Sequence, residues 1–230
     1  MTTASFAPAG LAGFALNARR LPIRRFFFAA LALICALGGS ARARPLRIVA
    51  LGDSLTAGYG LPADAAFPLR LQAALKARDF DVEIVNAGVS GDVSAGLLAR
   101  LDGTLGDGAD AAIVEIGAND MLRGLNPQQT EKNIDAILAR LQRRRIPFLI
   151  AGVRAAPDFD GPYAARFESF FKALSRKYRA PLYPFFLEGV AGHPDLQLPD
   201  RLHPNKKGVD AIVAGILPVV VAWLDELKRN

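Results

Sequence analysis

The sequence has few of the side chains that hold transition metals or form disulfides. Its 230 residues include one cysteine and two histidines. Cys35 lies inside an apolar run near the N-terminus, and His193 and His203 lie in the C-terminal part of the chain. Cysteine and histidine are the usual ligands of zinc, and both are too scarce here to form such a set. We therefore expect no metal site, no disulfide and no cysteine nucleophile in the mature protein.

Acidic residues are absent from the first 43 positions, which carry five arginines. Taking these five from the 28 basic residues of the chain leaves 23, against 22 acidic residues, so residues 44–230 have a net charge of +1. A basic stripe or patch is the electrostatic footprint of a nucleic-acid-binding protein. Because the basic excess is confined to the N-terminus, we expect no nucleic-acid partner.

The order of residues within 1–43 is that of a secretory signal peptide. Four arginines between Arg19 and Arg25 precede the apolar run Phe26–Leu37, and the small-x-small sequence Ala41-Arg42-Ala43 follows it. The run is shorter than the roughly 18–20 apolar residues that span a bilayer. We predict cleavage after Ala43, leaving a periplasmic or secreted protein, 44–230, with no stable membrane span. A retained membrane anchor is the alternative.

From residue 44 onward, short apolar runs alternate with amphipathic stretches. This alternation is typical of a parallel sheet covered by helices on both faces. With about five strands, no long linker and no internal repeat, the sequence predicts one α/β domain. Glu115 is the one polar residue in its strand. We expect strands at 46–51, 82–85, 111–116, 148–153 and within 181–186, and helices at 65–78 (with Asp64 as N-cap), 93–101, 127–144, 163–178 and 206–227 (bent at Pro218).

A serine directly follows the first predicted strand, in the segment Gly52-Asp53-Ser54-Leu55. Ligands of open α/β sheets bind at the carboxyl ends of the strands, which makes Ser54 a candidate nucleophile. A serine hydroxyl needs a base, a group that orients the base, and donors for the developing oxyanion. On this segment alone, Ser54 is equally typical of a residue that caps the following turn. Asp53 is interpreted as a turn residue without a catalytic role.

His203 is the better of the two candidate bases. It follows Asp200 by three residues, so one turn can bring the carboxylate to the imidazole. The carboxylate would fix the tautomer at one ring nitrogen, and the other nitrogen would take the Ser54 proton. Asp200 is also a candidate for capping a short turn. His193 has no matching upstream acid and is interpreted as a residue of a surface loop.

Two candidate oxyanion donors lie where later strands end. Gly91 follows the second strand, and a glycine lets its N–H approach a substrate oxygen closely. Asn119 follows the third strand and carries an amide, so both donors can converge with Ser54 at one edge of the sheet. Gly88 is a rival donor, and Asn119 is also typical of a turn residue with positive φ. Asp120 is expected to help position its loop.

Four segments together resemble the GDSL, or SGNH, hydrolase family. They are GDSLTAGYG (52–60), NAGVSGD (86–92), GAND (117–120) and DRLHPN (200–205), in the family's order. The resemblance covers essentially the whole mature chain. It is greatest to the bacterial periplasmic branch of thioesterases, lysophospholipases and arylesterases.

The resemblance implies a role for each candidate residue. Ser54 would be the nucleophile, His203 the base, and Asp200 the residue that orients His203. The oxyanion hole would consist of the Ser54 N–H, the Gly91 N–H and the Asn119 side chain. The resemblance also implies a flavodoxin-like three-layer α/β/α sandwich and no cofactor.

The sequence thus predicts an exported, monomeric serine esterase that acts on small acyl esters or thioesters. A carbohydrate O-acetylesterase is the main alternative enzyme, and a non-catalytic lipid- or carbohydrate-binding module is the alternative of another class. Apolar site loops suit an acyl chain or an aromatic ring better than a sugar. Several of these residues are also candidates for the core. They are Leu122, Leu125, Phe159, Phe185, Phe186, Leu187 and Val190.

A dinucleotide-binding loop is a further interpretation of Gly58-Tyr59-Gly60, which begins a G-x-G-x-x-A pattern after a strand. It is rejected because Pro62 interrupts the loop. In addition, the second strand ends near Asn86 and not at an acidic residue that would bind the ribose.

Overall fold

The computed structural model describes residues 1–2, 44–106, 108–154 and 161–229. The predicted signal peptide therefore lies almost wholly outside the described residues, as does Phe159, and cleavage after Ala43 stays a prediction. From Arg44 onward the chain forms one compact unit.

Five parallel strands form one sheet in the order β2-β1-β3-β4-β5. This is the flavodoxin-like order, so the predicted fold class is confirmed. Each strand begins within a residue or two of its predicted start, but β2 runs three residues further than expected. The strands are β1 (Leu46–Gly52), β2 (Val82–Gly88), β3 (Ala111–Glu115), β4 (Phe148–Ala151) and β5 (Leu182–Tyr183).

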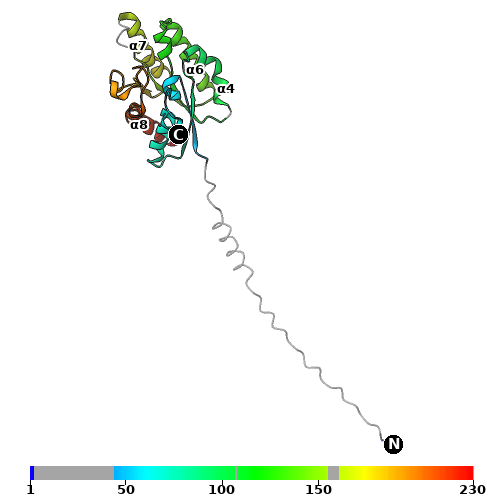
Figure 1. The fold of residues 1–230 in the computed structure, drawn as a ribbon. Coiled ribbons are helices and arrows are strands. Elements are labelled where there is room, and N and C mark those ends of the chain that lie inside the picture. The colour runs from blue at the N-terminus through cyan, green and yellow to red at the C-terminus, as the bar shows by residue number, and fades with distance from the viewer. Residues whose placement is uncertain (3–43, 107, 155–160, 230) are drawn as a thin grey trace. The chain divides into compact units, whose positions relative to one another are not determined.

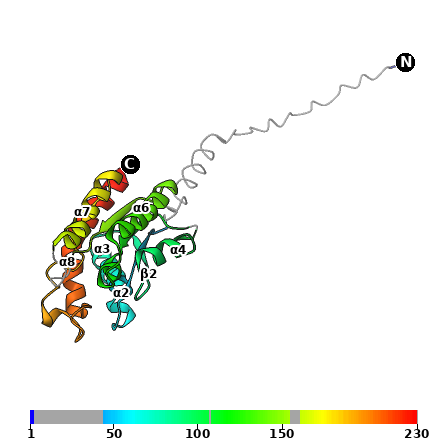
Figure 2. The same ribbon diagram turned by 90° about the horizontal axis from the view of Figure 1, so that it is seen from above.

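Five long helices cover the two faces of the sheet. Helices α3 and α8 pack together on one face, and α4, α6 and α7 lie side by side on the other (Figures 1 and 2). All five were expected from the sequence, with bounds that differ by up to four residues. They are α3 (Phe67–Lys76), α4 (Ser94–Leu105), α6 (Pro127–Arg143), α7 (Gly161–Tyr178) and α8 (Lys206–Arg229).

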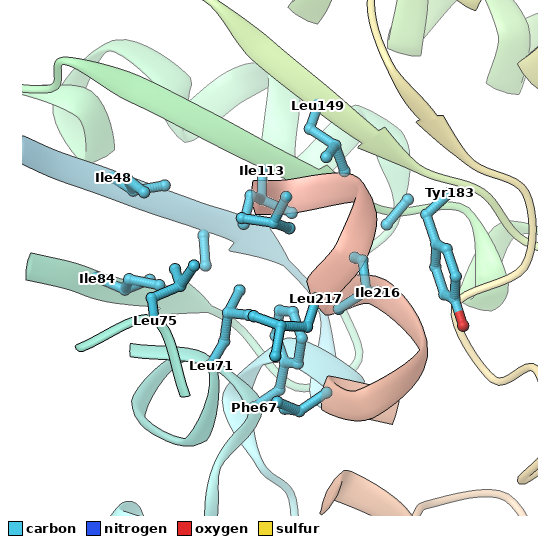
Figure 3. Close-up of a cluster of buried hydrophobic side chains, with 14 of the residues drawn as sticks. Ile48, Phe67, Leu71, Leu75, Ile84, Ile113, Leu149, Tyr183, Ile216 and Leu217 are labelled. Atoms are coloured by element: carbon cyan, nitrogen blue, oxygen red, sulfur yellow. The ribbon is translucent and has the colours of Figure 1, made fainter. Parts of the chain in front are cut away.

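The central strands β1, β3 and β4 are mostly apolar because each buries side chains on both faces of the sheet. In β1, Ile48 and Ala50 join the core beneath α3 and α8, whereas Val49 and Leu51 join the core beneath the other three helices. This alternation follows from the two-residue period of a strand. Figure 3 shows the first of these cores, where side chains of α3 and α8 meet Ile48 and its neighbours on β3 and β4.

Helix α8 is long and apolar enough, by length and composition, to cross a membrane. In the fold it is a core helix, because Val209, Ile212, Ile216 and Val220 are at most 1% exposed and pack against α3 and the sheet. The helix continues through Pro218. Its hydropathy is therefore accounted for by burial within the domain.

Short helical turns occupy the loops at the carboxyl edge. They are α2 (Ser54–Ala57), η1 (Ala63–Ala65), α5 (Ala118–Leu122) and η2 (Pro194–Leu196). The prediction that Asp64 caps α3 is wrong. Asp64 lies inside η1, and Ala66 occupies the N-cap without a side-chain hydrogen bond. Pro68 near the start of α3 lacks an N–H, which reduces what a cap has to satisfy.

The chain changes direction at the carboxyl ends of β1 and β3. After β1 it passes to α3 on one face of the sheet, and after β3 it passes to α6 on the other face. Such a topological switch point leaves a crevice in which ligands of open α/β sheets bind. Ser54 follows β1 and Asn119 follows β3, so both lie at this crevice.

Candidate active site

A tight turn from β1 into α2 presents Ser54 at the switch point. Gly52 allows the turn because a Cβ there would lie 2.1 Å from Thr56 Oγ1. Asp53 is the N-cap of α2, and its Oδ1 accepts the Leu55 N–H at 3.0 Å. Ser54 itself is only 8% exposed. The capping role considered for Ser54 therefore belongs to Asp53, and the serine hydroxyl is left to face the histidine.

The structure brings Ser54, His203 and Asp200 together as the sequence predicted. His203 Nε2 lies 2.9 Å from Ser54 Oγ, and His203 Nδ1 lies 2.7 Å from Asp200 Oδ2. With a proton on Nδ1 directed at the carboxylate, Nε2 is the acceptor for the serine hydroxyl. Residues 149 positions apart in the sequence thus form one hydrogen-bonded chain.

Asp200 combines both roles that the sequence left open for it. Its Oδ1 accepts the backbone N–H groups of Leu202 and His203 at 2.9 and 3.0 Å, while its Oδ2 faces the imidazole. Partial burial on its own would raise the pKa of Asp200, but these hydrogen bonds outweigh it and lower the pKa to about 2. The group is therefore a carboxylate at neutral pH and can stabilise a protonated His203.

Local hydrogen bonds hold the loop that carries His203. Gln197 Nε2 donates to the Arg201 carbonyl at 2.9 Å, and Asn205 Nδ2 donates to the Gln197 carbonyl at 3.2 Å. Arg201 adopts the left-handed conformation with φ of 56°. The ring of Tyr59 lies over the imidazole with the two ring centroids 4.4 Å apart. The histidine is thus oriented by its own loop and by one aromatic contact.

Gly91 and Ser54 both offer backbone N–H groups at this edge. Gly91 has φ of 80°, and among the described residues no hydrogen bond is found for its N–H. Ser54 is the first residue of α2, where N–H groups have no acceptor within the helix. The rival donor Gly88 is occupied, because its N–H donates to Asn86 Oδ1 at 3.1 Å. A glycine is needed at position 88 because β2 packs closely against α2 there: a Cβ would lie 2.3 Å from the Ala57 nitrogen.

Asn119 lies at the crevice, but its amide already has two acceptors. Its Nδ2 donates to Asp53 Oδ2 at 3.1 Å and to the Asp92 carbonyl at 2.9 Å. Donation to a substrate oxyanion therefore requires that one of these bonds be shared. The alternative that Asn119 is a turn residue with positive φ is wrong, because it lies inside α5 and adopts no such angle.

Asp120 joins the helices that surround Asn119. Its carboxylate accepts the N–H of Ser94 at 2.8 Å and the hydroxyl of Thr130 at 3.1 Å, and it is only 1% exposed. These bonds connect α5 to the first residue of α4 and to the first turn of α6. The expected positioning role of Asp120 fits this geometry.

Sequence reasoning missed two acids behind the serine. Asp53 and Glu115 are both fully buried, and burial raises the pKa of Asp53 to about 6. Burial, together with the neighbouring charge of Asp53, holds the pKa of Glu115 well above its usual range. The available signal was Glu115 itself, a lone acid in an apolar strand that ends beside the site.

The apolar residues expected to line the site fall into two groups. Leu122 and Leu125 are 44% and 40% exposed on the segment that follows Asn119. Phe186 and Val190, in contrast, belong to the core, which is the alternative that the sequence left open for them. Beyond β5 the chain turns back over α3, where the rings of Phe186 and Phe67 meet at 4.8 Å.

Three further exposed apolar residues border the site. Tyr59 and Leu202 are about half exposed beside His203, and Val89 is 46% exposed on the loop that leads to Gly91. His193 lies exposed in its loop, and the described residues provide no hydrogen-bond partner for its ring. The site therefore combines a hydrogen-bonded centre with exposed apolar residues on the segments around it.

The sequence matches the model of the GDSL-like lipase/acylhydrolase family over residues 50–211. The match therefore includes the end of β1, the Ser54 turn, both oxyanion segments and the His203 loop.

Individual relatives agree with this match. The chain is 32% identical to "Esterase TesA" of Pseudomonas aeruginosa over 75% of this chain and 87% of that protein. It is 36% identical to "Thioesterase 1/protease 1/lysophospholipase L1" of Escherichia coli strain K12, over 69% of this chain and 76% of that one. Among solved structures, AlinE4, an SGNH-hydrolase family esterase, is 43% identical with a TM-score of 0.67, covering 79% of this chain and 98% of AlinE4.

Proposed function

This chain belongs to the GDSL-like lipase/acylhydrolase family and is an ester hydrolase, and on that premise we propose that it works through an acyl-enzyme on Ser54. The observation that carries the proposal is the chain of contacts from Ser54 Oγ through the His203 ring to Asp200. A nucleophile next to a base that a third group orients is the signature of covalent catalysis.

In the acylation step, Ser54 Oγ bonds to the ester carbonyl carbon while its proton passes to His203 Nε2. The carbonyl oxygen becomes an oxyanion, and Asp200 stabilises the imidazolium that forms. When the tetrahedral intermediate collapses, the bond to the leaving alcohol or thiol breaks and His203 protonates the leaving group. Water then attacks the acyl-enzyme, His203 takes its proton, and collapse releases the acid and restores the Ser54 hydroxyl.

The oxyanion is stabilised by the N–H groups of Ser54 and Gly91 and by the Asn119 amide. Neither of the first two has an acceptor among the residues that the structure describes, so both are ready to donate. Asn119 contributes by sharing a bond that it now makes to Asp53 or to the Asp92 carbonyl. Fixed donors of this kind need little reorganisation during the reaction, which is the source of their catalytic effect.

The substrate is a small ester or thioester with an apolar acyl or aryl group. Support comes from exposed apolar side chains on the segments that carry the site residues, which are Tyr59, Val89, Leu122, Leu125 and Leu202. Burying such side chains against an acyl chain removes apolar surface from water on both partners. A sugar would present hydroxyl groups to the same border, which makes a carbohydrate O-acetylesterase the less favoured enzyme.

A substrate panel combined with covalent labelling tests this function. The purified chain should hydrolyse p-nitrophenyl esters and acyl thioesters faster than acetylated sugars. An activated alkyl phosphonate should form a single adduct, which peptide mass spectrometry places on Ser54. Ser54→Ala should show neither reaction, whereas His193→Ala should behave like the wild type. Preference for acetylated sugars would support the O-acetylesterase, and neither turnover nor adduct would support a binding module.

We further propose that the protein is exported and that residues 1–43 are removed. Support comes from the arginines, the apolar run and the small-x-small sequence that precede the domain. When the full-length chain is expressed in a Gram-negative host, mature protein beginning at Arg44 should appear in the periplasmic fraction. Intact N-terminal peptides in the membrane fraction would instead indicate a retained anchor.

A further inference from the structure

Two carboxyl groups lie buried directly behind Ser54, and the proposed mechanism uses neither of them. Asp53 precedes the serine, and Glu115 ends the neighbouring strand β3. Both residues are 0% exposed, and Glu115 reaches the turn that carries Asp53, because its Oε2 accepts the Thr56 hydroxyl at 2.8 Å. Glu115 is close enough to Asp53 for the charge of Asp53 to raise its pKa. Two ionised carboxylates at such a distance, away from water, repel each other strongly, so a pair of this kind holds one proton.

The hydrogen-bond partners of the two groups decide which one is ionised. Asp53 accepts an N–H on each oxygen, from Leu55 at 3.0 Å and from Asn119 at 3.1 Å. Glu115 accepts the Thr56 hydroxyl at 2.8 Å on Oε2, and its Oε1 has no partner among the described residues. Donors stabilise a carboxylate, which places the charge on Asp53. A proton on Glu115 Oε1 would satisfy that oxygen by donating to Asp53.

The other charged groups around the pair agree with a single negative charge. The charge of His203 lowers the pKa of Asp53 and so favours the carboxylate form. The negative charge of Asp92 raises that pKa and so favours the protonated form. The charge of Asp92 is balanced by Arg100, which contacts it at 2.8 Å and also donates to the Gly52 carbonyl at 3.0 Å. No cation is seen to pair with Glu115 in the part of the chain that the structure describes.

The charge state of this pair bears on the proposed oxyanion hole. Asp53 Oδ2 accepts from the Asn119 amide, so the position of the Asp53 carboxylate sets the position of that donor. A second negative charge on Glu115 would repel an oxyanion forming at the crevice, because charges interact strongly in a site with little water.

We propose that Glu115 keeps its proton in the active protein and, by donating it to Asp53, acts as a positioning residue for the Asn119 amide. This inference rests on the proposed function of Ser54 and Asn119. The carboxylic acid of Glu115 holds Asp53 in place and keeps the negative charge behind the serine at one unit.

Two substitutions at Glu115 separate its hydrogen bond from its charge. Glu115→Gln keeps a donor beside Asp53 without an ionisable group, so kcat for a p-nitrophenyl ester should stay within about threefold of wild type. Glu115→Leu fills the space without a donor, so kcat should fall about ten- to a hundredfold, the size expected for a lost hydrogen bond to a charged group. KM should change little. Glu83→Gln and Glu83→Leu, on the exposed side of β2, are the matched controls and should leave kcat unchanged.

The pH profile provides a readout that a purely structural role would not change. In the wild type, kcat should fall at alkaline pH as Glu115 loses its proton and the second charge appears. In Glu115→Gln this fall should be absent, because an amide does not ionise. An alkaline limb that is identical in both proteins would overturn the proposal.

Infrared difference spectroscopy tests the proton without any turnover. The wild type at pH 7 should show the carbonyl band of a buried carboxylic acid, and the band should be missing in Glu115→Gln. Absence of the band in the wild type, or a Glu115→Gln variant as slow as Glu115→Leu, would overturn the proposal. Failure of the esterase function would appear separately, as a wild type that hydrolyses no ester.

Discussion

The two halves of the site are built in different ways. The serine side (52–57 and 115–120) is attached to β1 and β3, and its acidic residues Asp53, Glu115 and Asp120 are at most 1% exposed. The histidine side (193–205) is a loop whose residues are largely exposed, Leu202 by 50%. The sheet positions the nucleophile, whereas hydrogen bonds within one loop position the base.

One aspartate on each side shows how the difference in burial changes the pKa of a carboxyl group. Burial raises the pKa of Asp53 to about 6, whereas three hydrogen bonds overcome partial burial and lower the pKa of Asp200 to about 2. Both are aspartates close in sequence to a proposed catalytic residue: Asp53 directly precedes Ser54, and Asp200 lies three positions before His203. The comparison shows that the environment, and not the residue type, sets the direction in which the pKa of each aspartate shifts.

The largest expected effect comes from breaking the contact between the two sides. Ser54→Ala and His203→Ala should each lower kcat by about 10⁴- to 10⁶-fold, because neither half of the proposed triad works alone. The double variant should lose no more than either single variant, which steady-state kinetics on one ester can measure. Losses that multiply in the double variant would mean that the two residues act independently.

The next effect concerns the serine side alone. Asn119→Ala removes a proposed oxyanion donor and should reduce kcat about 10²- to 10³-fold, equivalent to about 2.7–4 kcal/mol of transition-state stabilisation. Asn126→Ala is a suitable control, because Asn126 caps α6 away from Ser54. Its kcat should remain that of the wild type, although a lost cap costs about 1 kcal/mol of folding free energy. Equal rates for the two variants would remove Asn119 from the oxyanion hole.

The opposite pKa shifts predict opposite effects of pH on stability. The pKa of Asp53 is about 6 in the folded state, above its ordinary value of 3.8, so the folded state binds this proton more tightly than the unfolded state. The contribution of Asp53 to stability therefore falls as pH rises from about 4 to about 6. Asp200 binds its proton less tightly when folded, so its contribution is present above pH 4 and is lost as pH falls towards 2.

Urea unfolding across this pH range checks both signs. Asp53→Asn should reduce the change in the free energy of unfolding between pH 4 and pH 6. The reduction should be up to a few kcal/mol, since one pKa unit corresponds to about 1.4 kcal/mol. Asp200→Asn should flatten the change between pH 4 and 2. Flattening in the same window for both variants would contradict the division of the site into a buried side and an exposed side.

The smallest expected effect is on the histidine side. Arg201 has φ of 56°, a conformation that costs a residue with a Cβ roughly 1–2 kcal/mol. Arg201→Gly should relieve this strain and, after the greater freedom of glycine in the unfolded chain is counted, stabilise the protein by at most about 1 kcal/mol. The loop hydrogen bond from Gln197 uses only the backbone carbonyl of residue 201 and should persist. Thermal unfolding measures this, and a lower melting temperature would show that the Arg201 side chain has a role.

Much of the fold was predictable because the signals are local. The continuous apolar runs of β1 and β3 required burial on both faces, and the amphipathic period of α6 and α7 required one buried face each. The short helices α2 and α5 were harder to predict, because four or five residues carry no periodic signal. The sequence left open whether Phe186 and Val190 fill the core or line a site, because an apolar residue in a loop has the same sequence signature in both.

The sequence by itself determined the α/β class, the family and the candidate residues Ser54, Gly91, Asn119, Asp200 and His203, because hydrophobic period, turn residues and motif order can all be read along the chain. Only the tertiary structure decided that Asp53 and Glu115 share one buried space and that Asn119 donates to Asp53. It also showed that the Gly88 N–H already donates to Asn86 and is therefore not available as an oxyanion donor. The physical reason is that burial, charge proximity and hydrogen-bond partners depend on residues that meet only when β1 and β3 pair and the 193–205 loop closes over their ends.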